Sequence, residues 1–205
     1  MQSGSVMRQR MRKRGAYSKG KERREEILRA AFDVLSRDGY AHASLAQIGR
    51  ATGLDSAHIV YYFASREALL QEVLRAWDED NFAAFKDGGD VFDGWIETVR
   101  RNMRNPGIVQ LYTAFAAEAV DEAHPAHAFF QKRFAVLQGF ISDEIRRRQA
   151  AGRAPPGIDA DQAALMLIAQ SDGLQVRWLL DRSVDMAASL QLAIGALVDL
   201  REGTR

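Results

Sequence analysis

The stretch from Ser44 to Leu70, SLAQIGRATGLDSAHIVYYFASREALL, constrains this chain more than any other part of its sequence. Ser44 and Asp55 each precede a short apolar segment, where a side-chain oxygen can accept hydrogen bonds from the free N–H groups of a first helical turn. Gly53 suits a turn that needs a positive φ. We therefore predict two short helices joined by a tight turn, followed by a longer helix that Ser65 caps.

Helical periodicity extends through the rest of the chain, and strand-like alternation is absent from its sequence. An apolar face recurs from Ser18 until Gly39, which is a typical stop signal. Beyond the helix that starts at Ser65, we expect helices at residues 90–104, 106–122, 126–151, 159–182 and 185–202. The sequence predicts an all-α fold of about nine helices, with an N-terminal helix-turn-helix head of three helices and a C-terminal helical bundle.

The charge of the chain is unevenly distributed. Residues 1–66 contain 13 Lys or Arg and 6 Asp or Glu, whereas residues 67–205 contain 15 and 21, so a basic head precedes an acidic body. This asymmetry indicates that only the head meets a polyanion. We divide the chain into a basic arm that is disordered when free (1–17), a helix-turn-helix DNA-binding domain (18–64) and a second domain (65–205). The arm is either a solvated tail or a flexible arm that reaches phosphates or a minor groove.

The start of the second short helix has the composition of a surface that reads DNA. The major groove of B-DNA admits one helix, and the N-terminal residues of the second helix of a helix-turn-helix meet base edges. Small and polar side chains there permit close approach, and hydroxyl or guanidinium groups nearby suit phosphates. The candidate DNA-binding residues are Ser44, Gln47, Ser56, Ala57, His58, Val60, Tyr61, Tyr62 and Arg66. The alternative is a small helical subdomain with ordinary helix caps.

From Gly39 to Leu70 the sequence resembles the DNA-binding domain of the TetR (tetracycline-repressor) family of bacterial regulators. The residues that carry this resemblance are Gly39, Ser44, Ile48-Gly49, Thr52-Gly53-Leu54-Asp55, Ile59-Val60-Tyr61-Tyr62-Phe63 and Ser65-Arg66-Glu67-Ala68-Leu69. In the body, residues 172–180 resemble the penultimate helix of the family. Two positions depart from the family pattern: Val60 replaces a tyrosine, and His58 replaces a small or hydroxyl residue. We therefore expect an unusual base preference.

The resemblance implies a ligand cavity inside the body. Such a cavity would be mostly apolar with a few polar anchors, although the same aromatic side chains could simply be core. The candidates are Trp77, Phe92, Trp95, Met103, Tyr112, Phe115, Glu118, Phe134, Gln138, Gln170, Asp172 and Trp178. Few of the polar candidates are basic, so we expect a neutral or cationic, hydrophobic effector of unknown identity.

The family also implies a homodimer built from its last two helices, which would bind a palindromic operator. Apolar stripes in residues 159–182 and 185–202 provide the candidate dimer-interface residues Leu174, Trp178, Leu190, Ile194, Leu197 and Val198. The alternative is that these stripes only close the core of one protomer.

Other chemistries lack support in the sequence. Glu118, Glu122, His124 and His127 have a spacing that could suit a metal, but Pro125 interrupts any helix there, and we expect neither a metal nor another cofactor. No P-loop, dinucleotide fingerprint or nucleophile elbow is present, so we expect no enzyme. The absence of cysteine and of a long apolar run fits a bacterial cytoplasm without membrane association. We predict a ligand-responsive transcriptional regulator, in this family most often a repressor that a small molecule releases from DNA. The alternative is a helical architectural or activator protein that binds DNA without an effector.

Overall fold

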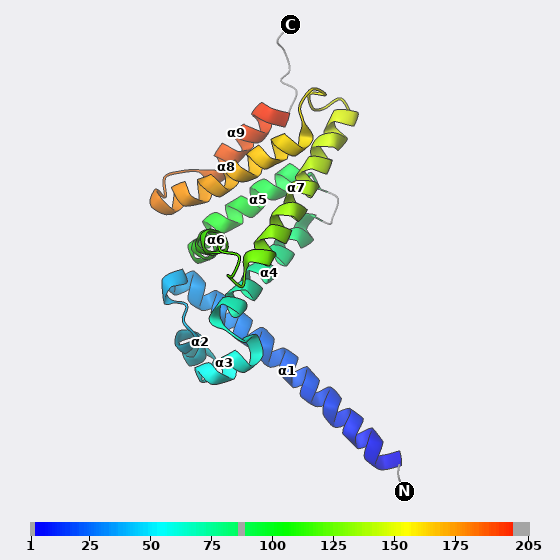
Figure 1. Cartoon of the computed structure of the whole chain (residues 1–205), viewed down its shortest axis with the longest axis vertical. Coiled ribbons are helices and arrows are strands. Elements are labelled where there is room, and N and C mark those ends of the chain that lie inside the picture. The colour runs from blue at the N-terminus through cyan, green and yellow to red at the C-terminus, as the bar shows by residue number, and fades with distance from the viewer. Residues whose placement is uncertain (1–2, 86–88, 199–205) are drawn as a thin grey trace. The chain divides into compact units, whose positions relative to one another are not determined.

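The computed structural model describes residues 3–85 and 89–198, and side chains within residues 19–81 and 89–198; all regular secondary structure in these residues is helical (Figure 1). The helices are α1 (Ser3–Asp38), α2 (Leu45–Thr52), α3 (Ser56–Phe63), α4 (Arg66–Phe85), α5 (Val91–Met103), α6 (Pro106–Glu118), α7 (His127–Ala150), α8 (Ala160–Leu180) and α9 (Met186–Val198). A short 3₁₀ turn, Tyr40–His42, precedes α2. The predicted all-α fold is therefore confirmed.

The chain forms two compact units, Met1–Val73 and Leu74–Arg205. The boundary lies inside α4, whereas the sequence analysis placed it after residue 64. The first turns of α4 belong to the first unit because Leu69 and Leu70 are fully buried and Glu72 pairs with Arg24 of α1 at 3.0 Å.

Helix α1 begins earlier than expected. Residues 3–17 are helical and continuous with the following segment, so the expectation of a disordered arm differs from the structure. The segment is rich in Arg, Lys, Gln and Met, which have high helix propensity. Extending an existing helix adds one hydrogen bond for each residue fixed and avoids the unfavourable nucleation step. The basic segment is therefore the N-terminal half of a 36-residue helix.

The turn between α2 and α3 depends on two glycines. Gly53 has φ 66°, a left-handed conformation that favours glycine, and its N–H closes α2 on the carbonyl of Gly49. The N–H of Leu54 donates to the same carbonyl at 2.9 Å. A Cβ added to Gly49 would lie 2.4 Å from the carbonyl oxygen of Leu54, so the close approach of these two backbone segments requires glycine.

The second unit is a bundle around α8, which packs against α6, α7 and α9, while α9 also packs against α5 (Figure 1). Its core contains fully buried aliphatic side chains from three of these helices, including Ile145, Leu167 and Leu190. The five helices predicted after α4 are all present. Helix α6 ends at Glu118 instead of residue 122, and the predicted end of the last helix at residue 202 lies outside the described residues.

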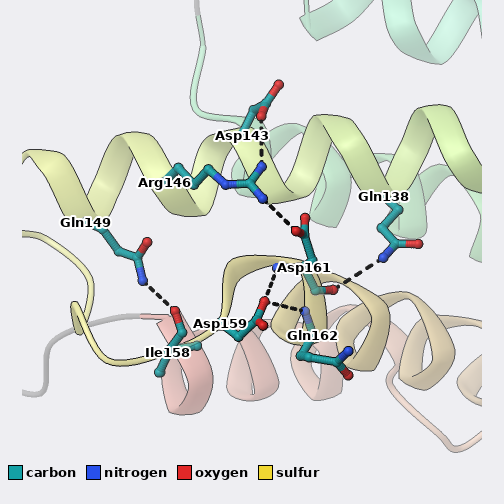
Figure 2. A network of polar contacts seen from close by, with 8 residues as sticks. All are labelled: Gln138, Asp143, Arg146, Gln149, Ile158, Asp159, Asp161 and Gln162. Carbon is teal, nitrogen blue, oxygen red and sulfur yellow. Dashed lines mark hydrogen bonds and ion pairs between the residues drawn. The ribbon is translucent and has the colours of Figure 1, made fainter.

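Polar contacts fix the connection between α7 and α8 (Figure 2). Gln149 of α7 donates from Nε2 to the carbonyl oxygen of Ile158 at 2.8 Å, as the figure shows, and to that of Pro155 at 2.9 Å. Asp159 caps α8 by accepting from the N–H groups of Asp161 and Gln162. The loop is thereby held by one side chain from each end. No helix in the described part of the chain combines the length and the apolar character needed to cross a membrane.

Candidate functional site

The caps predicted for the helix-turn-helix are present. The Ser44 hydroxyl accepts from the N–H of Gln47 at 3.2 Å, and the Asp55 carboxylate accepts from the N–H of His58 at 2.8 Å. Ser65 caps α4 in the same way, accepting from the N–H of Ala68 at 3.0 Å. These contacts set where α2, α3 and α4 begin, and they leave the start of α3 facing solvent.

Helix α3 buries one face and exposes the other. Ile59 and Phe63 are buried. The candidate DNA-binding residues on the other positions of this helix are accessible: Ser56, Ala57, His58, Val60 and Tyr61 are exposed, and Tyr62 is half-buried. On α2 and its cap, Ser44 is exposed and Gln47 is half-buried. The structure thus gathers eight of the nine candidates on accessible positions of two adjacent helices.

Arg66 is placed differently from the expectation. Its Nε donates to the carbonyl of Ala43 at 2.8 Å, its Nη2 donates to the carbonyl of Tyr40 at 2.9 Å, and its Nη1 lies 3.8 Å from Glu67. The guanidinium also stacks over the Tyr40 ring. These two hydrogen bonds use two of the five N–H donors of the guanidinium, and through them Arg66 fastens the 3₁₀ turn to α4.

An acidic residue stands at the N-terminus of α3. Besides the N–H of His58, the Oδ1 atom of Asp55 lies 3.1 Å from Nδ1 of the His58 ring. The hydrogen bond from the His58 N–H holds the pKa of Asp55 below its usual value, so the carboxylate is charged at neutral pH. Asp55 was recognised from the sequence only as a helix cap.

A cavity of about 80 Å³ lies within the second unit. It is lined by residues of α4, α5, α6, α7 and α8 and by Met186 of α9. Four of the predicted pocket residues contribute to its wall, namely Trp77, Trp95, Tyr112 and Asp172.

A polar network crosses the wall of this cavity. Tyr112 donates its hydroxyl hydrogen to Oδ1 of Asp172 at 2.8 Å, and Gln175 donates to the same oxygen at 3.3 Å. Arg133 pairs with Asp78 through two hydrogen bonds of 2.7 and 3.0 Å and also approaches the Tyr112 hydroxyl at 3.4 Å. Asp78 is therefore neutralised by a bidentate partner, whereas the hydrogen bonds to Asp172 come from neutral groups.

The charges in this network alter the ionisation of its members. Burial raises the pKa of Asp172, although the Tyr112 hydroxyl and the Arg133 charge oppose that shift. Burial, together with the neighbouring Asp172, also raises the pKa of Tyr112, so its hydroxyl stays protonated and remains a donor.

The other predicted pocket residues lie outside the cavity wall. Phe92 and Trp178 are buried in the core and carry the guanidinium groups of Arg148 and Arg182 over their rings. Met103 and Phe134 pack against that core, and Phe115 is fully buried. Three polar candidates also point elsewhere: Glu118 contacts His124 at 3.4 Å, Gln138 donates to the Asp161 carbonyl (Figure 2), and Gln170 is exposed.

Several polar residues of the cavity wall were not predicted from the sequence. They are Asp78, Asn81, Thr98, Asn102, Arg133, Ser171 and Gln175. Asp78 and Arg133 are 55 positions apart in sequence, and each resembles an ordinary surface residue of an amphipathic helix. The neighbouring positions Ser171 and Gln175 could have been found from the four-residue spacing that puts them on one face of α8.

The predicted dimer-interface residues do not form an exposed face. Trp178, Leu190, Ile194 and Val198 are buried in the core of the protomer, and Leu174 and Leu197 pack against that core. Apart from Met166, the apolar residues that α8 exposes lie on the opposite face, at Leu165, Ala169, Gly173, Val176 and Leu180. Their spacings of four, four, three and four residues form one stripe along the helix. We call these five residues the α8 stripe.

The histidines near the end of α6 have other partners than a metal. His124 accepts from the N–H of Ala126 and contacts Glu118, and Nδ1 of His127 lies 2.7 Å from the carbonyl of Ala119. Among the described residues, no group of three or more His, Asp or Glu side chains is arranged to hold a metal ion.

A helix-turn-helix head joined to a helical unit with an aromatic cavity defines a class of DNA-binding transcription regulators. A family profile described as bacterial regulatory proteins, tetR family, matches residues 27–73, and one described as BetI-type transcriptional repressor, C-terminal, matches residues 91–200. The chain therefore belongs to the TetR family of bacterial transcriptional regulators.

Full-length relatives agree with this assignment. The chain is 23% identical to the regulator UidR of Escherichia coli K12, with 85% of this chain and 92% of UidR covered. It is 25% identical to the regulator TtgR of Pseudomonas putida, with coverages of 91% and 95%. A solved structure of a transcriptional regulator from Saccharomonospora viridis in complex with choline has the same fold, with a TM-score of 0.72, 22% identity and coverages of 88% and 100%.

Proposed function

We propose that this regulator is a homodimeric repressor that a small organic cation releases from a palindromic operator. The observation that carries the proposal is the charge balance of the cavity, where the two carboxylates Asp78 and Asp172 face one guanidinium, that of Arg133. A ligand that brings one positive charge would complete this balance.

The walls of the cavity suit the same ligand. Trp77, Trp95 and Tyr112 provide aromatic groups around it, and aromatic faces attract cations through the ring quadrupole, most strongly when water is excluded. A cation beside Asp172 would also favour the ionised carboxylate, which burial otherwise disfavours. An organic anion would meet the uncompensated carboxylate and bind poorly.

The size of the cavity restricts the ligand further. A volume of about 80 Å³ is well below the roughly 300–1,000 Å³ of pockets for drug-sized ligands. The similar regulator from Saccharomonospora viridis was solved with choline, a small quaternary ammonium ion. Choline is therefore the first compound to test, as a representative of the chemical class.

We expect choline to bind the full chain and its uncharged carbon analogue, with a tert-butyl group in place of trimethylammonium, to bind at least tenfold more weakly. The two compounds have nearly the same shape, so the difference measures the charge. Quenching of tryptophan fluorescence can report binding, because two of the three tryptophans line the cavity. Glycine betaine, which adds a carboxylate, should also bind more weakly than choline.

Other results of this titration would contradict the proposal. Equal binding of choline and its uncharged analogue would show that the cavity selects shape alone. Tighter binding of an organic anion would refute a cationic effector. If ammonium compounds of this size fail to bind, the alternative of a regulator without a small-molecule effector gains support.

The homodimer is supported by the α8 stripe. Leu165 and Val176 each keep 48% of their accessible surface and Leu180 keeps 83%. Exposed aliphatic side chains arranged in one row are characteristic of an interaction face. Space is open above Gly173, so a second helix could approach α8 closely at that point. A twofold dimer carries two copies of α3, as the two half-sites of a palindromic operator require.

Replacing Val176 by arginine should convert the dimer into a monomer at micromolar concentration. The substitution places a charge in the middle of the α8 stripe, where pairing would bury it without a partner. Sedimentation velocity measures the change, and operator binding should fall with it. Val120→Arg, at a residue that is 80% exposed outside the stripe, is the matched control and should remain dimeric. A dimeric Val176→Arg protein would place the interface elsewhere.

Effector binding has a direct connection to the DNA-binding unit along the chain. Helix α4 contributes Leu69 and Leu70 to the first unit and Trp77 and Asp78 to the cavity. A ligand that contacts Trp77 and Asp78 would favour one arrangement of this helix over another. It can shift the equilibrium between DNA-binding and free states only by its difference in affinity for the two.

A further inference from the structure

We infer that Asp55 and His58 act together as a base-reading pair that recognises the exocyclic amino group of cytosine or adenine in the major groove. The inference rests on the start of α3 and on DNA binding by the family, and it does not depend on the effector or on the dimer proposed above.

The geometry of the pair determines which atoms can donate and accept. Oδ1 of Asp55 accepts from the backbone N–H of His58 at 2.8 Å and lies 3.1 Å from its Nδ1. An ionised carboxylate has no proton to give, so the contact with Nδ1 favours the ring form with its proton on Nδ1. In this tautomer Nε2 is an acceptor.

Exposure makes this acceptor available. The side chains of His58 and Asp55 retain 67% and 66% of their accessible surface, in the first turn and at the N-cap of α3, the second helix of the helix-turn-helix. The second carboxylate oxygen of Asp55, Oδ2, is a further acceptor. The corner formed by these two residues therefore presents acceptors on side chains where many helix-turn-helix proteins present donors.

The charge of Asp55 restricts where this corner can lie on DNA. A carboxylate against the sugar-phosphate backbone is repelled, because phosphate contacts are made by cations and neutral donors. In the major groove the same carboxylate can accept a hydrogen bond from a base. The acid is therefore compatible with base reading and incompatible with a role in holding the backbone.

The base code then restricts the partner. In the major groove, cytosine offers its N4 amino group and adenine its N6 amino group as donors, whereas guanine and thymine offer only acceptors and a methyl group. Acceptors on Asp55 and His58 can pair with the first two bases and would face acceptors on the other two. We expect a discrimination of about 5- to 150-fold at this position.

The experiment begins with selection of the DNA sequences that the full chain binds. In the best sequence, each adenine or cytosine of a half-site is replaced in turn by its analogue without the amino group, which is purine for adenine and 2-pyrimidinone for cytosine. At one position the wild-type chain should lose about 5- to 150-fold in affinity, and the identity of that base separates cytosine from adenine. The same base analogue should lower the affinity of His58→Ala and Asp55→Ser only slightly, because in these variants the acceptors are already absent or displaced.

Asp55→Ser provides a second readout that a purely structural cap would not give. Serine can still cap α3, so folding should be retained. Removal of a negative charge from the DNA surface should tighten binding to random-sequence DNA while the preference for the amino base is lost. Asp33→Asn is the matched control: it removes one negative charge from an exposed residue of α1 in the same unit. This variant should keep the preference for the base with the amino group.

Two outcomes would overturn the inference. In the first, removing the amino group lowers the affinity of His58→Ala and Asp55→Ser for DNA by as much as it lowers that of the wild-type chain. The other is that replacing a guanine or a thymine of the selected sequence lowers the affinity of the wild-type chain but not that of the two variants, while every other replacement affects all three chains alike.

Discussion

Replacing Arg148 by alanine is expected to destabilise the second unit by about 3–5 kcal/mol, the cost of leaving a buried charge without its partner. Arg148 is 11% exposed and joins Asp90 at the start of α5 to Glu144 of α7, through contacts of 2.5 and 2.9 Å. Its guanidinium also lies 4.5 Å from the centre of the Phe92 ring. Glu144 is 2% exposed and would keep only its contact with Arg147, a side chain that is mostly in solvent.

Chemical denaturation followed by tryptophan fluorescence measures this loss, because all three tryptophans lie in the second unit. Arg146→Ala is the matched control: Arg146 lies on the same helix and makes two ion pairs, but it is half-exposed and its pairs are screened by water (Figure 2). Its removal should leave the denaturation midpoint nearly unchanged. Adding Glu144→Gln to Arg148→Ala should restore part of the stability, and a double variant as unstable as the single one would contradict the argument.

The same ion pair predicts sensitivity to acid. Burial opposes the ionisation of Asp90, but the N–H groups of Asp93 and Phe92 and the charge of Arg148 outweigh it and hold the pKa of Asp90 below its usual value. A depressed pKa contributes stability above the ordinary value of about 3.9, and this contribution is lost as the pH falls through the folded-state pKa. The Arg148→Ala chain should therefore lose less of its stability over that acidic range than the wild-type chain.

Asp172→Asn should weaken the binding of a cationic effector by about 10- to 100-fold, the expected loss of a charge-assisted contact in a partly buried site. Asparagine has the shape of aspartate and can still accept from the Tyr112 hydroxyl, so the network should keep its geometry. The uncharged analogue of the cation should bind both chains alike. Titration of the two chains with both compounds separates the charge from the shape.

The affinity for the cation should also decrease as the pH falls. Burial raises the pKa of Asp172, so protonation removes its charge at a higher pH than for an ordinary aspartate. The amide introduced by Asp172→Asn does not titrate, so the variant should lack this dependence. Glu118→Gln is the control, because this acid lies outside the cavity wall and pairs with His124. An equal effect of both substitutions would exclude a specific role for Asp172.

The helices and the starts of α2, α3 and α4 could be predicted because they depend on local chemistry. Ser44, Asp55 and Ser65 cap their helices as expected, since a cap needs only an oxygen and the N–H groups three residues ahead. The helix-turn-helix was therefore clear from sequence alone. The structure differs from the prediction at residues 3–17, where the sequence lacks an apolar face but keeps a high helix propensity.

The cavity and the exposed face of α8 could not be predicted in the same way. Periodicity shows that a helix has apolar residues at certain positions, but it does not show which neighbour covers them. Leu190 and Ile194 were assigned to a dimer interface and are instead covered by other helices of the same protomer. Arg133 and Asp78 appeared as solvent-exposed charges, although their pairing across 55 residues forms the wall of the cavity.

Helix α8 carries cavity residues such as Ser171 and Gln175 on one face and the α8 stripe on another, with Asp172 at the edge of the stripe. If both faces are occupied as proposed, ligand binding and self-association become linked equilibria, and each must change the other by the same factor. The dissociation constant of an effector would then depend on the concentration of the regulator itself. Titrations at nanomolar and at micromolar protein would give different values for one compound, and the cellular copy number of the protein would tune its own sensitivity.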